Sequence, residues 1–335
     1  MGIGGGYSGP AMAAFTPLST HDAETLLSAY ALGELRRLSV VTAGSVNSNF
    51  RLEVGRAGSE RAVFLRVFEE QGDEGARYDA ALLAHLAARG VPSPQPLRRR
   101  DGEAVSHVAG KPAVLFPYVD GVHSCQRAVG FGRVEALGRA LGQLHRAGLT
   151  FPQRRAGRFG LAQIRERLPR IAASPDPALS AMAPQLATAL DRWTAARADA
   201  VPEGVVHGDL FRDNVLWKTA DGPGHHDVTA LLDFESASDG RLIYDLAVTV
   251  LAWCHGESFD VGLARALVAG YETVRRLEEA ERAAMRAELA IAALRFTVTR
   301  ITDYAMPRGG GERVIKDWRR FWARLAAVEA MPPWW

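Results

Sequence analysis

The amino-acid sequence predicts an α+β fold, in which a small mixed β lobe precedes a larger, mainly helical lobe. Short runs rich in β-branched and aromatic residues, separated by Gly, Ser and Asn, fill much of the first hundred residues and are typical of strands. From Phe131 onward, apolar residues recur at intervals of three and four, which indicates amphipathic helices. We expect a disordered tail at residues 1–12, an N-terminal lobe at 13–117 and a C-terminal lobe at 118–335.

The N-terminal lobe is predicted to start with a helix after Ser19, because Ser19 and Asp22 have the spacing of a capping box. A second helix is expected from about Arg77 to Arg89, where Gly90 ends it. Strands are expected in residues 38–54, which hold two of them, and in residues 61–68, 97–108 and 111–119. The predicted order after the first helix is therefore β-β-β-α-β-β.

The C-terminal lobe is predicted to be helical except for one β hairpin within residues 205–234. The helical pattern returns after Tyr244 and continues almost to the end of the chain. Helices are expected over residues 134–148, 162–172 and 185–198, with loops marked by Pro175, Pro177 and Pro184.

Composition argues against several classes of protein. The net charge of +2, from 40 basic and 38 acidic residues, provides no broad basic surface for nucleic acid. No apolar run approaches the roughly 18 residues that span a bilayer. Cys125 and Cys254 are too few for a disulfide framework, and the first residues lack the features of a signal peptide. We expect a cytoplasmic protein that acts on a small molecule, as a monomer or a homodimer.

The predicted hairpin carries a set of residues suited to phosphoryl transfer. Asn214 enters its first strand and Asp233 leaves its second, so antiparallel pairing makes them neighbours, with Asp209 one loop away. Amide and carboxylate oxygens suit Mg²⁺, which shares its ligands with phosphates, and a further carboxylate can accept a proton from an attacking hydroxyl. The order base, Asn, metal Asp is that of protein kinases. An Asp-rich turn that only satisfies backbone donors is the structural alternative.

Two further residues are predicted to support this loop. His207 precedes Asp209 by two positions and is expected to brace the loop rather than to move protons. Asp245 lies among apolar residues, and a buried carboxylate needs partners. We expect Asp245 to accept hydrogen bonds from the backbone of the loop or from His207.

A second group of residues is predicted to bind ATP. The turn between two predicted strands contains small and polar residues whose backbone and side-chain groups can donate to phosphates, namely Gly44, Ser45, Asn47, Ser48 and Asn49. An ordinary hairpin turn would look similar, and no Walker sequence occurs. The segment from Phe116 through Tyr118 is expected to offer backbone groups to adenine.

A cation is also needed for the phosphates, and no lysine precedes Lys111. Arg66 lies within a predicted strand and can bind phosphate oxygens through two guanidinium nitrogens. The alternative is an edge-strand arginine that faces water. A helix carboxylate would pair with Arg66, and either Asp79 or Glu74 is suitable.

Three segments carry a resemblance to a known group of enzymes: residues 44–50, GSVNSNF; residues 207–217, HGDLFRDNVLW; and residues 233–254, DFESASDGRLIYDLAVTVLAWC. They resemble the aminoglycoside phosphotransferase and choline kinase superfamily, whose fold is two-lobed and protein-kinase-like. The resemblance is greatest to the bacterial homoserine kinases of that superfamily. It implies ATP-dependent phosphorylation of a small-molecule hydroxyl, most simply of L-homoserine to O-phospho-L-homoserine in threonine biosynthesis.

The resemblance also implies residue roles. Asp209 is expected to be the catalytic base, Asn214 and Asp233 to hold Mg²⁺, and the Ser45–Asn49 loop to cover the phosphates. Glu235 stands where the kinases have Gly, and it is expected to add a metal ligand.

Some residues depart from the pattern of homoserine kinases and leave other acceptors open. Those enzymes usually have Ala at the place of Gly208, an aromatic residue at that of Glu235, and Asn-Asp at that of Leu251-Ala252. Choline, ethanolamine, an aminoglycoside or a sugar are the alternative acceptors, and a nucleotide-binding pseudokinase is the alternative outside enzymes. Candidates for acceptor binding, by location and charge alone, are Asp239, Arg295, Arg300 and Asp303.

Overall fold

The computed structural model describes residues 16–335, except residues 43–45, 57, 199, 219–225 and 307–315. The predicted tail at residues 1–12 lies outside this part. The chain divides into two compact units. Unit 1 comprises Met1–Arg89 and Ser93–Asp120, and unit 2 comprises Gly90–Pro92 and Gly121–Trp335. Both units contain helices and antiparallel strands, so the predicted α+β class is confirmed.

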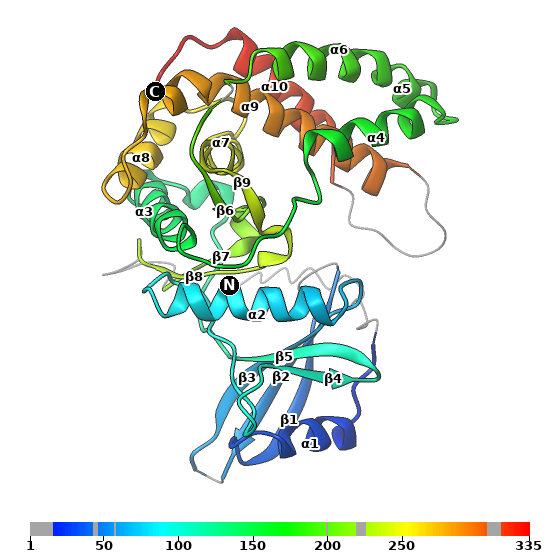
Figure 1. Ribbon diagram of the computed structural model, residues 1–335, viewed down its shortest axis with the longest axis vertical. Helices are drawn as coiled ribbons and strands as arrows, with labels where there is room; N and C mark the ends of the chain where they lie inside the picture. The colour runs from blue at the N-terminus through cyan, green and yellow to red at the C-terminus, as the bar shows by residue number, and fades with distance from the viewer. Residues whose placement is uncertain (1–15, 43–45, 57, 199, 219–225, 307–315) are drawn as a thin grey trace, which may run out of the picture. The chain divides into compact units, whose positions relative to one another are not determined.

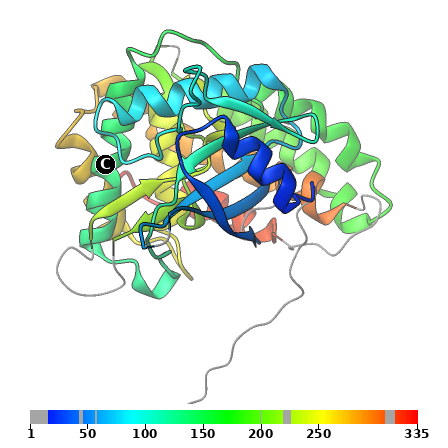
Figure 2. The same ribbon diagram turned by 90° about the horizontal axis from the view of Figure 1, so that it is seen from below.

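Unit 1 is built on a five-stranded sheet with the order β1-β2-β3-β5-β4, in which every neighbouring pair is antiparallel. Its elements are α1 (Thr20–Ser28), β1 (Glu34–Val41), β2 (Ser48–Gly55), β3 (Arg61–Val67), α2 (Asp73–Ala87), β4 (Val105–Val108) and β5 (Lys111–Pro117). Helices α1 and α2 lie on opposite faces of this sheet (Figures 1 and 2). Ser19 and Asp22 form the predicted capping box at the start of α1.

Two predictions for unit 1 are wrong in detail. Helix α2 begins at Asp73 rather than Arg77, because Asp73 and Glu74 in its first turn favour the helix N-terminus. Of the strand expected over residues 97–108, only Val105–Val108 forms. The residues before it make a turn, in which the Arg99 amide donates to the Glu103 carbonyl over 2.8 Å.

Unit 2 is mainly helical, with two small sheets. Its helices are η1 (Gln126–Ala128), α3 (Phe131–Gly148), α4 (Leu161–Ala172), α5 (Pro177–Ser180), α6 (Met182–Ala195), η2 (Arg212–Asn214), η3 (Phe234–Ser236), α7 (Leu242–Trp253), α8 (Val261–Glu272), α9 (Glu279–Arg300), η4 (Ile301–Ala305) and α10 (Arg319–Ala330). Pro184 lies in the first turn of α6 rather than in the expected loop, at a position where the helix needs no amide hydrogen.

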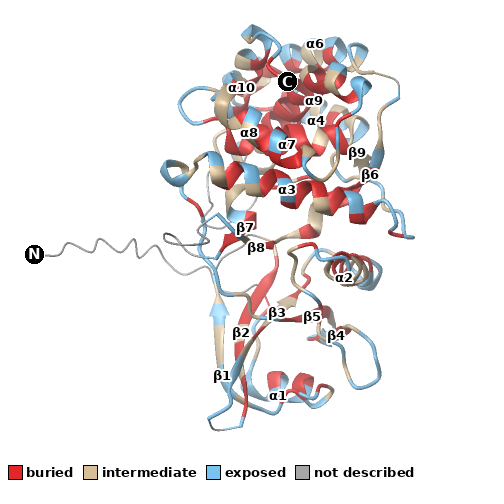
Figure 3. Ribbon diagram, turned by 90° about the vertical axis from the view of Figure 1, so that its left-hand side faces the viewer, coloured by how far each residue is buried: buried red, intermediate tan, exposed pale blue. Residues whose placement is uncertain are grey.

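Helix α7 forms the centre of unit 2. All of its residues except Tyr244 are buried, and α3, α8 and α9 pack around it (Figures 1 and 3). A helix that is apolar on every side is stable only when it is enclosed. No helix in the described ranges combines the length and apolar character needed to cross a membrane.

The two small sheets hold the polar loops of unit 2. Strand β6 (Glu203–Val206) pairs with β9 (Ser238–Arg241), and β7 (Val215–Trp217) pairs with β8 (Val228–Leu231), both antiparallel. The predicted hairpin is β7–β8, whereas the pairing of β6 with β9 was not predicted. Strands β7 and β8 form the hairpin, and β6 and β9, which precede and follow it in the chain, pair with each other. The loop from β6 to β7 and the loop from β8 to β9 therefore run side by side.

Helices α3 and α8 approach each other closely through glycine. A Cβ atom on Gly138 would lie 2.0 Å from the Leu267 carbonyl oxygen, and one on Gly270 would lie 2.0 Å from that of Glu135. These contacts leave no room for a methyl group, and they fix the position of α3 against α8.

We expect Gly138→Ala to lower the free energy of unfolding by about 2–3 kcal/mol, because the helices must separate to admit the methyl group. Urea unfolding measures this change. Gly256→Ala is the control, since its Cβ would meet its nearest atom at an ordinary 3.5 Å. Equal stability of the two variants would contradict the close helix contact.

Candidate active site

The β6–β7 loop brings the predicted base and the predicted metal amide together. The Asn214 side-chain amide donates to the backbone carbonyl of Asp209 over 2.8 Å, and Asn214 is buried. This bond leaves the Asn214 side-chain oxygen available as an acceptor or a metal ligand. The Asp209 side chain is 32% exposed, so it can reach a ligand.

Asp233 lies on the neighbouring β8–β9 loop. The amide of Leu232 donates to the Asn214 carbonyl over 2.8 Å, which places Asp233 one residue beyond the partner of Asn214, as the hairpin predicted. Asp233 has φ 61° and ψ 69°, and only it and Ala109 among the described non-glycine residues have positive φ. Left-handed backbone at a polar residue marks a functional site when the surroundings enforce it.

His207 links the two loops. Its Nε2 bonds to the Leu232 carbonyl over 2.8 Å, and its Nδ1 accepts from the Asp209 amide over 3.3 Å. His207 therefore braces the loop at both ends of its ring, in keeping with the predicted supporting role.

Asp245 on α7 accepts the backbone amides at the start of the loop. Its two carboxylate oxygens bond to the amide of His207 at 2.6 Å and to that of Gly208 at 2.8 Å, as predicted. Gly208 has φ 74°, in the left-handed region that favours glycine, and this conformation turns both amides toward the carboxylate.

His145 on α3 completes this support and was not predicted. Its Nε2 lies 3.0 Å from Asp245 and its Nδ1 lies 2.7 Å from the Tyr271 hydroxyl, all fully buried or nearly so. Arg275 donates to the same hydroxyl and pairs with the buried Glu281. In the sequence His145 is one polar residue on an apolar helix face, which gives no sign of its partners.

This network controls the charge of Asp245. Burial alone would raise the pKa of its carboxyl group, but the hydrogen bonds and charges of His145 and His207 outweigh burial and hold the pKa below its ordinary value. Asp245 therefore stays ionised and keeps accepting both loop amides at neutral pH.

Arg295 contacts the predicted base directly. Its guanidinium lies 3.3 Å from the Asp209 carboxylate, and the residue is only 4% exposed. It is stacked on the rings of Phe159 and Phe296, with its Cζ 4.3 and 3.8 Å from their centroids. The sequence placed Arg295 among candidates for acceptor binding, and the structure adds its contact with the Asp209 carboxylate.

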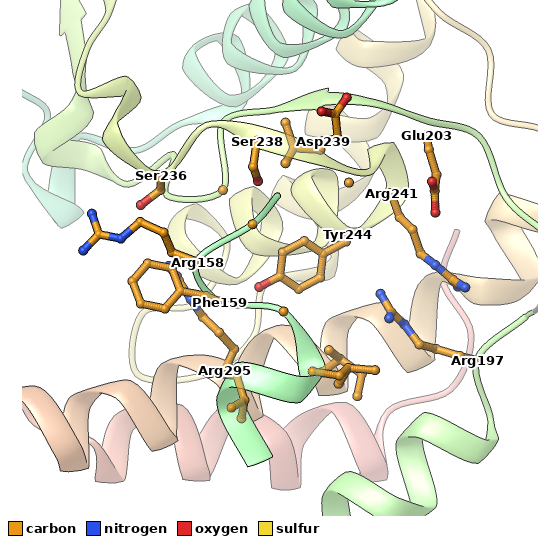
Figure 4. A pocket seen from close by; sticks show the side chains of 18 of the residues that line it. Arg158, Phe159, Arg197, Glu203, Ser236, Ser238, Asp239, Arg241, Tyr244 and Arg295 are labelled. Carbon is orange, nitrogen blue, oxygen red and sulfur yellow. The ribbon is translucent and has the colours of Figure 1, made fainter. Parts of the chain in front are cut away.

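A cavity of about 260 Å³ lies beside Gly208 (Figure 4). Asp239 and Arg295 are among its lining residues, and Tyr244 lies in its middle. Burial raises the pKa of Tyr244 to about 12, so its hydroxyl remains a neutral donor. The Asp239 carboxylate forms an ion pair with Arg154 at 2.5 Å.

The other two candidates for acceptor binding lie outside the cavity lining. Asp303 forms an ion pair with Arg167 at 2.8 Å. Arg300 donates to the backbone carbonyl of Asp317 over 2.9 Å. Asp303 is thus neutralised by Arg167, whereas Arg300 forms no ion pair with any carboxylate in the described ranges.

The structure describes only part of the predicted phosphate-binding turn in unit 1. Gly44 and Ser45 lie outside the described residues. Asn47 accepts from the Glu69 amide over 3.1 Å, and the Ser48 hydroxyl donates to the Glu69 carboxylate. Lys111 also donates to Glu69. Burial acts to raise the pKa of Glu69, but the hydrogen bonds of Lys111, Ser48 and Thr16 outweigh it and lower the pKa.

Arg66 occupies the centre of the unit 1 sheet. Strand β3 lies between β2 and β5, and Arg66 pairs in register with Asn49 and Val114. Arg66 is therefore not the edge-strand arginine of the alternative interpretation. On α2, Asp79 is 4% exposed whereas Glu74 is exposed, so Asp79 is the carboxylate placed in the interior.

The segment expected to offer backbone groups to adenine lies at the end of β5. Phe116 is buried in register with Phe64. The Tyr118 amide donates to the Ala62 carbonyl over 3.2 Å, and Arg51 stacks on the Tyr118 ring at 5.1 Å.

A metal ion at this site would need ligands of more than one chemical kind. Within the described part of the chain, no three His, Cys, Asp or Glu side chains gather as an ion site. A hard cation would therefore need the Asn214 amide oxygen and the Asp233 carboxylate, completed by phosphate oxygens, which is how Mg²⁺ is usually bound. Glu235 follows in η3 and is half-buried.

Two features together define a kinase-like phosphotransferase. One unit has a five-stranded antiparallel sheet, and the helical unit carries an Asp, an Asn and a second Asp on two paired loops. Two solved structures share the fold. A spectinomycin phosphotransferase, solved with ADP and spectinomycin, matches with a TM-score of 0.67 at 11% identity, over 94% of this chain and 99% of that chain. A choline/ethanolamine kinase family protein from Mesorhizobium loti matches with a TM-score of 0.58 at 21% identity, over 93% and 94%.

The chain belongs to the phosphotransferase enzyme family, whose model matches residues 37–287. It is 35% identical to a homoserine kinase of Beijerinckia indica subsp. indica, over 94% of this chain and 95% of that protein. It is 36% identical to a homoserine kinase of Methylobacterium radiotolerans, over 94% and 95%. The predicted kinase-like fold and enzyme class are confirmed.

We expect Asp245→Asn to lower the free energy of unfolding by about 2–4 kcal/mol at pH 7, since an amide nitrogen would face the donors of the loop or His145. The folded-state pKa of Asp245 is depressed. Its contribution is thus complete above the unfolded pKa of about 3.9 and is lost as the pH falls through the folded pKa.

Urea unfolding at several pH values between about 7 and 3 tests this expectation. The difference between wild type and Asp245→Asn should shrink below about pH 4. Asp191→Asn is the control, because that carboxylate is 68% exposed in its pair with Arg165. A difference that stays constant with pH would show that the charge of Asp245 is not what stabilises the loop.

Proposed function

We propose that this protein transfers the γ-phosphoryl group of ATP to the hydroxyl of L-homoserine, giving O-phospho-L-homoserine. The observation that carries the proposal is the braced β6–β7 loop, in which Asp209 and Asn214 are bonded together next to Asp233. The 35% and 36% identity to homoserine kinases over nearly the whole chain supports this acceptor.

The residues of unit 2 have distinct roles in this proposal. Asp209, oriented by Arg295, accepts the proton of the acceptor hydroxyl as that oxygen attacks phosphorus. Asn214 and Asp233 would hold Mg²⁺, with Glu235 as a further candidate ligand. Bound there, the ion would neutralise charge on the phosphates. Phosphoryl transfer of this kind depends on positioning and electrostatics rather than on covalent catalysis.

Unit 1 is proposed to bind the nucleotide. Arg66, with Asp79 as its carboxylate partner, is the cation for the phosphates. The predicted turn residues are proposed to cover the phosphates with backbone donors, namely Gly44, Ser45, Asn47, Ser48 and Asn49. Backbone groups near Phe116 and Tyr118 are proposed to meet adenine.

A coupled ADP-release assay with Mg²⁺ tests the acceptor. The panel is homoserine, choline, ethanolamine, aminoglycosides and hexosamines. Turnover of homoserine with the highest kcat/KM supports the proposal. A higher kcat/KM for another member of the panel would show that this other compound is the acceptor. Binding of Mg-ATP without turnover of any member would support the pseudokinase instead.

Asp209→Asn should lower kcat by about 10²–10⁴-fold, because the amide cannot accept the hydroxyl proton. Binding of ATP, measured by calorimetry, should be retained. Asp213→Asn is the matched control on the same loop, since Asp213 is exposed, and it should keep near-wild-type kcat. A kcat of Asp209→Asn close to that of the control would refute Asp209 as the base.

Arg66→Met should raise the KM for ATP by about 10-fold or more, through loss of a charge-assisted hydrogen bond to phosphate, with a smaller effect on the KM for the acceptor. The control is Arg61→Met, at an exposed position of the same strand. An unchanged KM for ATP in Arg66→Met would remove Arg66 from the nucleotide site.

A further inference from the structure

Unit 2 contains two arginine-rich regions that differ in how their charge is balanced. In the cavity of Figure 4, Arg197 and Arg241 donate to the fully buried carboxylate of Glu288. Arg295 there is paired with Asp209. The cavity therefore contains guanidinium groups that the protein itself neutralises.

The second region is an arginine cluster formed by Arg212, Arg300 and Arg324. Arg300 at the end of α9 and Arg324 on α10 both stack on the ring of Phe321, with Cζ atoms 4.4 and 4.3 Å from its centroid. Phe321 also packs against the ring of Phe211, the residue before Arg212 in the β6–β7 loop. Two cations thus lie on one aromatic ring, and the charge of Arg212 acts on Arg324.

None of these three cations forms an ion pair with a described carboxylate. All of their hydrogen bonds to described residues go to neutral oxygens. Arg212 donates to the side chain of Gln126 and to the Ala252 carbonyl at 3.5 Å. Arg300 donates to the Asp317 carbonyl at 2.9 Å, and Arg324 donates to the His255 carbonyl at 3.4 Å. Arg324 is only 9% exposed, and its Nε and Nη1 are buried without a hydrogen-bond partner among the described residues.

Such an arrangement is costly for the folded protein alone. A buried cation needs a partner, and three neighbouring cations repel one another. Burial and then the charges of Arg300, Arg212 and Arg320 lower the pKa of Arg324 to about 9. Burial lowers the pKa of Arg300 to about 10, against the opposing effect of Asp209. Both groups remain cationic at neutral pH, so a bound anion would relieve the repulsion.

The cluster is also next to the predicted base. Arg212 lies three residues after Asp209 on the same loop, and the charge of Asp209 acts on Arg300. An anion bound by the cluster would therefore belong to a molecule whose hydroxyl can meet Asp209.

We propose that Arg212, Arg300 and Arg324 bind the carboxylate of the acceptor, and that the substrate class of this enzyme is carboxylate-bearing alcohols. This inference rests on the proposed function, because it assumes that Asp209 faces the acceptor hydroxyl. Choline, ethanolamine and aminoglycosides lack a carboxylate and would bring positive charge toward unpaired cations, so the cluster selects against them.

The first test is Arg324→Met, assayed for ADP release. Loss of charge-assisted hydrogen bonds to a carboxylate raises the KM for homoserine by about 10- to 100-fold, while kcat and the KM for ATP change little. Arg319→Met, at an exposed position on the same helix, is the matched control and keeps the wild-type KM. Arg300→Met is a second variant, at a less buried position, and gives the same pattern.

Acceptor analogues separate recognition of the carboxylate from other effects. Wild-type enzyme prefers homoserine over homoserinamide, in which the carboxylate is a neutral amide, by about 10- to 100-fold in kcat/KM. It also phosphorylates 4-hydroxybutyrate, which retains the carboxylate and lacks the amine. The preference for homoserine over homoserinamide disappears in Arg324→Met.

Thermal unfolding distinguishes ligand binding from a structural role. Arg324→Met has a Tm equal to or above that of wild type, because it removes an unpaired buried charge, and homoserine raises the Tm of wild type only. A lowered Tm with unchanged KM and unchanged discrimination against homoserinamide would overturn the inference while leaving homoserine phosphorylation intact. Failure of wild type to phosphorylate any carboxylate-bearing alcohol would overturn both.

Discussion

The buried carboxylate of Asp245 is the interaction on which the loop of the candidate active site depends. The loop contains a left-handed glycine, Gly208, the residue type whose backbone is the least restricted. Asp245 accepts two consecutive backbone amides and is itself held by His145. Because α7 is buried in unit 2, Asp245 ties the start of the loop to the helical core.

The same kind of support explains why the candidate catalytic side chains need few contacts of their own. The two small sheets fix the ends of both loops, and backbone bonds join them, as between Leu232 and Asn214. The Asp209 carboxylate is contacted by the guanidinium of Arg295, which two aromatic rings hold in place. Rigid support with an accessible carboxylate is the arrangement that phosphoryl transfer requires, since its catalysis is mainly positioning.

Local signals in the sequence predicted the features that depend on local structure. The capping box at Ser19 and the β7–β8 hairpin follow from residue spacing and turn chemistry, and both are present. The partners of His145 and the pairing of β6 with β9 join segments far apart in the chain, and no periodicity encodes them. Arg295 was a candidate for acceptor binding by location and charge alone, and its contact with Asp209 follows from the packing of α9.

The buried arginines of unit 2 differ in whether a described carboxylate balances their charge. Glu288 and Glu281 are fully buried, and each neutralises guanidinium groups that it contacts, so those ion pairs are complete within the fold. Arg324 is nearly as buried but has no described carboxylate, and the fold bears the cost of its charge. Stability alone would favour an apolar side chain at such a position. An unbalanced cation near the candidate base is therefore best explained by a ligand that supplies the missing negative charge.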